Sequence, residues 1–226
     1  MPIRKYPLNT NEIYHIFNKT IDNKNIFINY KICNYFYNLS RYYRSEKGII
    51  SYSNLHRLSN ENRNDYIKKI TMLRYHRVEI ISYNLMPNHF HFILKQKKDK
   101  GISVFISNVI NSLTKIYNKQ SRRLGPVFLP RFKSVLVETD EQLIHLSRYI
   151  HLNQYSSKIF NNKEDLLKYP WSSFHEYIEN PKKRLSNDKM ILSLFNDNRN
   201  RYKNFVLDNA DWQRTRELIK YMEKYK

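Results

Sequence analysis

Three short stretches of the chain have the residue pattern of β-strands. Residues 14–18 and 78–85 are runs rich in β-branched and aromatic side chains. In the third stretch, residues 89–94, the side chains at every second position are apolar: Phe90, Phe92 and Leu94. Between the second and third stretches stands Met86-Pro87-Asn88, and proline favours a strand boundary. We therefore predict a first strand and, further along, an antiparallel hairpin-like pair.

Other stretches repeat apolar residues three or four positions apart, which predicts helices. The first stripe is Ile32, Phe36, Leu39 and Tyr43, and a longer one, within 102–123, is Phe105, Val109, Leu113 and Ile116. Residues 139–142 (Thr-Asp-Glu-Gln) have the form of a capping box, so a helix is predicted to start there and to run through Leu143, Leu146 and Ile150. The remaining expectations are a polar loop over 45–64, a helix over 66–77 and further strand at 127–129 and 132–138.

The composition fits one large domain, or one domain with an appendage, that binds a polyanion. The 226 residues include 40 Lys and Arg against 20 Asp and Glu, which gives a formal charge of +20. Such an excess favours nucleic acid as the partner, although a coding sequence rich in A and T accounts for part of the lysine. A lone cysteine, Cys33, excludes an internal disulfide and a thiolate-rich metal site. With neither a signal peptide nor an apolar membrane span, we expect a cytoplasmic protein.

The histidines of His89-Phe90-His91 are the first candidate for chemistry. Side chains two apart in a strand point the same way, so both imidazoles would lie on one face and could hold a metal ion. A bare His-x-His is a weak signal, because two histidines on a strand without any metal give the same pattern.

The helix predicted from residue 139 supplies the other candidates. Tyr149 and Asn153 are four apart and share a face of it, with His145 one turn earlier. Packed beside the histidine strand, this face would offer the Asn153 amide oxygen as a third ligand and the Tyr149 hydroxyl to a molecule bound there. A tyrosine that only packs has the same periodicity.

Four segments together resemble the HUH-type single-tyrosine transposases, nearer to the branch of REP-associated tyrosine transposases than to the mobile insertion-sequence enzymes. They are residues 14–20 (YHIFNKT), 85–95 (LMPNHFHFILK), 131–134 (RFKS) and 146–153 (LSRYIHLN). Residues 169–173 and 192–195 resemble the C-terminal part of that branch. Relatives often continue after the tyrosine helix with Asn-Pro-Val-Arg-Ala-Gly, whereas Asn153 is followed here by Gln-Tyr-Ser-Ser-Lys. Gln154 is therefore a competing candidate for the third ligand.

The resemblance implies a fold, a site and a reaction. The implied fold is of the α/β (α+β) class, ferredoxin-like, with a central antiparallel sheet, helices on one face and a helical C-terminal tail. A catalytic domain would span residues 1–157, and an extension over 158–226 would pack on it or contact DNA. His89 and His91 would be the metal ligands, Asn153 the third ligand and Tyr149 the nucleophile, with Mg²⁺ or Mn²⁺ as cofactor. The implied partner is single-stranded or hairpin DNA, bound by a monomer or a homodimer at the nucleoid of a prokaryotic cell.

The residue types suit that chemistry. A divalent cation stabilises the charge on a phosphodiester under attack, and a tyrosine phenolate can then form a covalent 5′-phosphotyrosine. That link conserves the energy of the broken bond, which suits strand transfer better than hydrolysis. Arg131, Lys133 and Arg148 are candidate phosphate contacts, and a solvated strand face explains Arg131 and Lys133 equally well. His145 is a candidate to orient Tyr149, with a solvent-facing histidine as the simpler interpretation.

Two other functions fit the same sequence. A domesticated protein could recognise DNA hairpins without cutting them, although binding alone needs no metal ligands. A metal-dependent nuclease could use water as its nucleophile, in which case Tyr149 would only pack.

Overall fold

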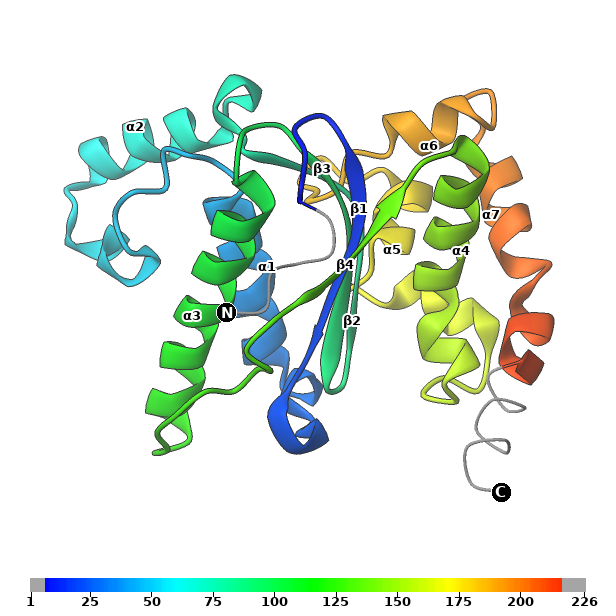
Figure 1. Ribbon diagram of the computed structural model, residues 1–226, viewed down its shortest axis with the longest axis horizontal. Helices are drawn as coiled ribbons and strands as arrows, with labels where there is room; N and C mark the ends of the chain where they lie inside the picture. The colour runs from blue at the N-terminus through cyan, green and yellow to red at the C-terminus, as the bar shows by residue number, and fades with distance from the viewer. Residues whose placement is uncertain (1–6, 217–226) are drawn as a thin grey trace.

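Three layers make up the protein, a four-stranded sheet between two groups of helices (Figure 1). The computed structural model describes residues 7–216. Helices α1 (Tyr30–Tyr43) and α3 (Gly101–Gln120) cover one face of the sheet, and α4 (Asp140–Ser156) lies on the other with the C-terminal helices. Short 3-10 turns connect these elements at Ile21–Asn23, Ile26–Ile28, Tyr52–Arg57, Leu73–Tyr75 and Lys163–Lys168.

The sheet has the order β2-β3-β1-β4, and all its neighbouring strands are antiparallel. Its strands are β1 (Ile13–Lys19), β2 (Val78–Met86), β3 (His89–Gln96) and β4 (Lys133–Val137). The predicted hairpin is confirmed, because Met86 pairs with His89 across the Pro-Asn turn. With α1 and α3 as the two crossover helices, this connectivity is ferredoxin-like, as the expected fold class requires.

The segment between α1 and β2 differs from the expectation. Helix α2 spans Asn60–Thr71, so it starts inside the predicted loop and ends before the predicted helix does. Ser59 explains the early start, since its side chain accepts a hydrogen bond from the backbone N–H of Asn62 and caps the helix. Strand β4 is also shorter than predicted, and Phe128 makes only an isolated bridge to Thr20. Among residues 7–216, no helix has the length and apolar character needed to cross a bilayer.

Helices cover both faces of the sheet rather than one, because the strands bury side chains on both sides. Phe90 and Phe92 of β3 point into the larger hydrophobic cluster, under α1 and α3. Ile93 of β3 and Ile81 of β2 belong to a second cluster, which they share with Ile150 of α4. The expectation of helices on one face, which the family resemblance implied, was wrong, because the apolar side chains on the second face of the sheet are covered by α4 and the helices after it.

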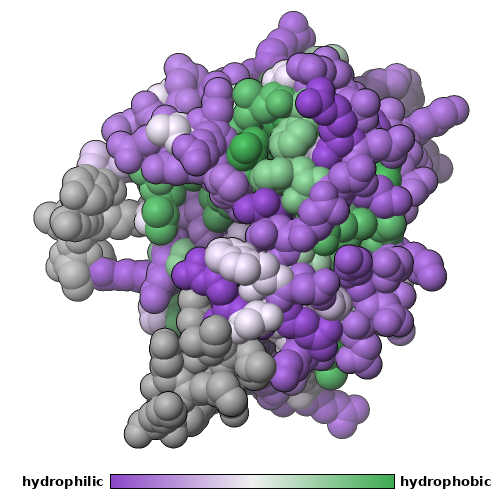
Figure 2. All heavy atoms as spheres, turned by 90° about the vertical axis from the view of Figure 1, so that its right-hand side faces the viewer, coloured by the Kyte–Doolittle hydropathy of each residue, from purple (hydrophilic) through white to green (hydrophobic). Residues whose placement is uncertain are grey.

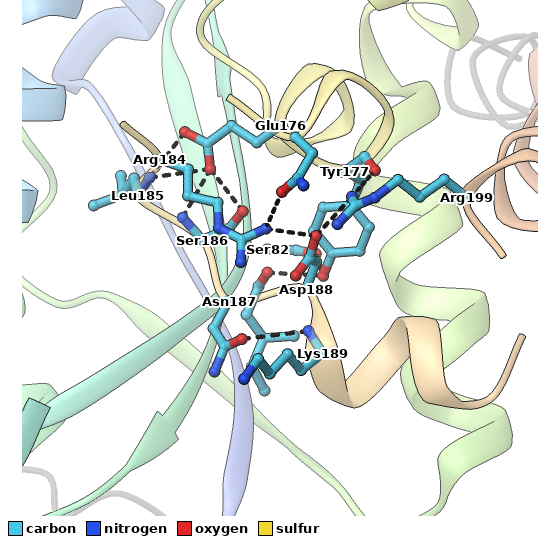
Figure 3. Close-up of polar contacts among 12 residues, drawn as sticks. Ser82, Glu176, Tyr177, Arg184, Leu185, Ser186, Asn187, Asp188, Lys189 and Arg199 are labelled. Carbon is cyan, nitrogen blue, oxygen red and sulfur yellow. Dashed lines mark hydrogen bonds and ion pairs between the residues drawn. The ribbon is translucent and has the colours of Figure 1, made fainter. Parts of the chain in front are cut away.

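The residues after α4 form α5 (Ser173–Glu179), α6 (Lys189–Ser193) and α7 (Arg199–Leu207), which pack into this second cluster. A buried carboxylate, Glu176, fastens the segment between α5 and α6 (Figure 3). It accepts hydrogen bonds from the backbone N–H groups of Leu185 and Ser186 and from the hydroxyls of Ser186, Tyr37 and Tyr83. Because Tyr83 lies on β2 and Tyr37 on α1, this one side chain joins the extension to the sheet and to the helix layer on its far side.

Candidate functional site

The two histidines of β3 lie side by side on the face of the sheet that carries α4. Phe90 between them points into the opposite core, as strand alternation requires. The ring centres of His89 and His91 are 5.0 Å apart, and the ring planes are nearly perpendicular at 80°. This arrangement brings the predicted pair together on one surface.

One ring nitrogen of each histidine is already engaged by a neighbour. The Nδ1 of His89 lies 2.6 Å from Oδ1 of Asn88, and the Nδ1 of His91 lies 2.9 Å from Nε2 of His15 on β1. Each ring is thereby left with Nε2 as the nitrogen for another ligand. Sequence reasoning gave Asn88 and His15 no role, although both stand in the segments that carry the family resemblance.

Burial keeps these imidazoles neutral. It lowers the pKa of His15 and that of His89 to about 4, with Lys19 adding to the effect at His89. The pKa of His91 is well below its usual value, first because of burial and then because of His89, His15 and Lys19. A neutral imidazole is the form that binds a metal ion, so the pair is ready to act as a ligand at pH 7.

Helix α4 brings Tyr149 against the same pair. The helix starts at the predicted cap, where the Thr139 side chain accepts a hydrogen bond from the backbone N–H of Gln142. The Tyr149 ring then lies edge-on to His91, with 6.1 Å between ring centres and 86° between planes. Tyrosine and histidines therefore meet within one chain.

Two buried amides hold α4 on the sheet. Asn84, opposite His91 on β2, donates from Nδ2 to the Ile150 carbonyl and to Oε1 of Gln154, at 2.6 and 2.7 Å. Gln154 in turn donates to the Leu85 carbonyl at 2.5 Å. With its oxygen and its nitrogen both used in this brace, Gln154 is a poor candidate for the third ligand. Asn84 was missed by sequence reasoning, and its signal was a polar residue within an otherwise apolar end of a strand.

Asn153 lies one turn after Tyr149 and is differently placed. Its side chain is buried, and its Nδ2 has no hydrogen-bond partner among the described residues. An amide can present oxygen or nitrogen at nearly the same position, so this orphaned group can turn an oxygen toward a bound ion.

The donor set as a whole fits a divalent cation that keeps part of its coordination for phosphate oxygens or water. Two neutral imidazoles and an amide supply few ligands, and residues 7–216 contain no cluster of three or more His, Cys, Asp or Glu side chains that could hold a metal. Such a donor set would leave coordination positions open to other ligands, as catalytic metal sites do and closed structural sites do not.

The predicted phosphate contacts fall in different places. Lys133 on β4 lies over the Phe17 ring at 5.9 Å, and Phe17 in turn lies 5.7 Å from His91, so strand β1 separates Lys133 from the pair. Arg131 is exposed just before β4. Arg148 is on the outer side of α4, stacked on Phe205 at 4.4 Å and 2.7 Å from Nδ1 of His145.

The two histidines of α4, His145 and His151, contact neighbouring side chains of the protein. His145 is half-exposed and contacts Arg148 and Glu141, as the solvent-facing interpretation expected. His151 is fully buried, with its ring nitrogens 2.7 Å from the Ser173 hydroxyl and 2.8 Å from the Tyr202 hydroxyl.

A hollow of about 370 Å³ adjoins Tyr149 on its outer side. Its lining includes Arg148, Trp212 and Arg216, and the indole of Trp212 is 57% exposed. Gln213 fixes this stretch to α4, because it donates to the Tyr149 carbonyl and to the Ser156 hydroxyl. Sequence reasoning left the role of this region open, since no periodicity or motif there points back to Tyr149.

Comparison with known proteins bears on the family resemblance and on the fold. Residues 52–154 match the family model described as IS200-like transposase, which confirms the resemblance over that segment. A solved structure of a REP-associated tyrosine transposase bound to a REP hairpin has a similar fold, with a TM-score of 0.54 and 13% sequence identity. The similarity covers 83% of this chain and 90% of that one. No curated protein matches the chain.

Proposed function

We propose that this protein is a transposase that cleaves and rejoins single-stranded DNA near hairpins. The match of residues 52–154 to the IS200-like transposase family supports this proposal. The contact of Tyr149 with His91 supports this proposal most directly. This contact places the proposed nucleophile beside the proposed metal ligands. Neither the tyrosine alone nor the histidine pair alone would indicate this reaction.

Each residue has a distinct part in the proposed reaction. His89 and His91 would bind Mg²⁺ or Mn²⁺ through Nε2, and Asn153 through its amide oxygen. The bound cation would supply polarisation of the scissile phosphate and stabilise its added charge. Lys133, which lies above Phe17 and is separated from the histidine pair by β1, would hold the phosphate backbone.

Tyr149 would form the covalent bond. Its oxygen attacks the phosphorus and the bond from phosphorus to the 3′ oxygen breaks. The tyrosine proton passes to a base or to solvent, and the leaving 3′ oxygen takes up a proton from solvent to become a hydroxyl. The 5′-phosphotyrosine so formed keeps the energy of a phosphodiester. A 3′-hydroxyl can then reverse the attack and join strands without ATP.

The surface is suited to DNA. The side that carries α4 and the C-terminal helices is mainly hydrophilic, with apolar side chains gathered in limited areas (Figure 2). Together with the formal charge of +20, this favours binding of DNA through its phosphates. The proposed place of this binding is the nucleoid, in the cytoplasm. Because Tyr149 lies beside the histidines of its own chain, one protomer contains the whole proposed site, whether the protein acts as a monomer or a homodimer.

The test is a covalent trapping experiment. Labelled single-stranded hairpin DNA is incubated with the protein and Mn²⁺, and a denaturant-resistant adduct is expected on gels. Tyr149→Phe should lose the adduct and retain hairpin binding, because the basic surface is unchanged. Tyr155→Phe is a matched control on the same helix, since Tyr155 bonds to Asp211 away from the histidines, and it should form adduct as the wild type does.

The two competing functions give different outcomes. Cleavage without adduct, unaffected by Tyr149→Phe, would identify a nuclease that uses water. Hairpin binding with neither cleavage nor adduct would identify a binding protein. Either result would overturn the transposase proposal.

A further inference from the structure

A third imidazole contacts the metal-binding couple from the neighbouring strand. His15 on β1 stacks on His91, with 5.1 Å between ring centres and 18° between planes. Its Nε2 lies 2.9 Å from Nδ1 of His91, which is hydrogen-bonding distance. The nitrogen of His91 that faces His15 is therefore not the one that could face a cation.

Only one proton can lie between these two nitrogens when both rings are neutral, and its position decides what His91 can do. If His15 donates, the proton of His91 is on Nε2, and that nitrogen cannot bind a metal. If His91 donates from Nδ1, its Nε2 keeps a free lone pair.

His89 shows the second arrangement on the same strand. The partner of its Nδ1 is the Oδ1 of Asn88, an oxygen that can only accept. With the Asn88 amide in this orientation, His89 donates from Nδ1 and presents Nε2. A metal shared by the two histidines requires the same tautomer of His91.

The geometry points to His15 as a positioning residue, which accepts the Nδ1 proton of His91 and thereby keeps the Nε2 lone pair of His91 available to the cation. This inference rests on the proposed metal-binding function of the pair. Metal-bound histidines commonly donate their other N–H to a fixed acceptor, and removal of that acceptor weakens metal binding. Here the acceptor is an imidazole, supplied by a strand that lies outside the segment matched to the transposase family.

A purely structural role for His15 is the alternative. The ring packs against Phe17 at 4.8 Å as well as against His91, so an aromatic side chain of any kind would fill this space. The two roles separate when the ring is kept and the acceptor is removed, or when the acceptor is kept and the ring is removed.

Three substitutions in the full chain make the test. His15→Phe keeps an aromatic ring without an acceptor, and His15→Gln keeps an acceptor near the position of Nε2. Val135→Ala is the matched control, because Val135 pairs with His15 across β1 and β4 and is exposed. Mn²⁺ binding is measured without DNA by the electron paramagnetic resonance of the free ion, and the His91 tautomer is read in the metal-free protein from imidazole ¹⁵N chemical shifts.

His15→Phe should weaken Mn²⁺ binding about 10- to 100-fold and shift His91 away from the Nδ1–H tautomer. His15→Gln should recover most of the affinity together with the Nδ1–H tautomer, and Val135→Ala should match the wild type in both measurements. Wild-type affinity and an unchanged His91 tautomer in His15→Phe would overturn the inference. So would a loss in His15→Gln as large as that in His15→Phe, because the ring rather than the acceptor would then matter.

The failure of the proposed function has a different signature. A wild-type protein that binds no Mn²⁺ would contradict the proposed metal site. The tautomer measurement needs no metal, so in that case an Nδ1–H form of His91 that depends on the acceptor at position 15 would still support the contact, and its absence would still refute it.

Discussion

The neighbouring amide side chains of Asn153 and Gln154 on α4 have opposite surroundings, which suits the proposed roles of a ligand and of a brace. Gln154 uses its oxygen and nitrogen to bond Asn84 and the Leu85 carbonyl. Asn153 is equally buried, yet its Nδ2 has no partner among the described residues. A buried amide nitrogen without a partner costs stability, which agrees with the proposed ligand role of this side chain one turn after Tyr149.

Substitution of the two amides should therefore have opposite effects. Asn153→Ala should weaken Mn²⁺ binding at least about tenfold while the free energy of unfolding changes by less than about 1 kcal/mol. Gln154→Ala should lower the free energy of unfolding by about 1–3 kcal/mol, because its buried partners lose their hydrogen bonds. It should weaken Mn²⁺ binding less than Asn153→Ala does. Urea denaturation and metal titration of both variants decide the question. Equal Mn²⁺ affinities in Asn153→Ala and the wild type would remove Asn153 from the site.

At the scale of elements, the candidate site depends on where α4 lies. The sequence predicted the helix and the face that carries Tyr149, but not its contact with the sheet. The cap at Thr139 and the four-residue spacing of Tyr149 and Asn153 predicted the helix and its face. Strand alternation likewise placed His89 and His91 together. These are local patterns, set by the periods of helix and strand.

The contact between the two elements was not readable from these patterns. Asn84 clamps α4 to β2, and His15 reaches His91 from β1; both contacts join residues distant in sequence. Periodicity carries no information on such pairs. The family resemblance placed Tyr149 at the histidine pair, but it gave neither Asn84 nor His15 a role. The bounds of α2 were mispredicted for a local reason, because the Ser59 cap lies in a stretch whose polar composition suggested a loop.

The stretch that carries Trp212 adds an aromatic surface beside the tyrosine of α4. If the cleaved strand passes Tyr149, a flanking base can stack on the exposed indole, with Arg148 and Arg216 near its phosphates. Trp212→Ala should then weaken single-stranded DNA binding by about 1–3 kcal/mol, and Trp212→Phe by less. Fluorescence anisotropy with a hairpin that bears a single-stranded extension measures both.

The control for that experiment is Tyr30→Ala, which removes another exposed aromatic side chain at the start of α1. It should bind as the wild type does. A loss for Tyr30→Ala equal to that for Trp212→Ala would mean that DNA does not follow the hollow beside Tyr149.

At the scale of the whole molecule, buried neutral histidines make the fold sensitive to acid. Burial lowers the pKa of His151 to about 3, and burial with the charge of Arg44 lowers that of His76 to about 4. The two residues lie in different parts of the molecule, so the effect is not confined to the candidate site. In the unfolded chain a histidine titrates near pH 6.5.

The unfolded state therefore binds more protons than the folded state below about pH 6.5. Stability should be fully present above that pH and should fall as the pH drops toward about 4, by up to about 1.4 kcal/mol per pH unit for each such histidine. Urea unfolding at several pH values measures the slope. His151→Asn should flatten it, because the buried imidazole that resists protonation is removed.

The central place of β1 has a consequence for how the protein is made. This strand pairs with β3 on one side and β4 on the other, and both partners are translated much later than β1 itself. A nascent chain must therefore keep the apolar side chains of β1 unpaired until most of the sheet has left the ribosome, which favours slow folding and a need for chaperones. A fragment limited to residues 52–154 would also lack β1, the inner strand that joins β3 to β4, so it could not form the sheet on which both histidines stand.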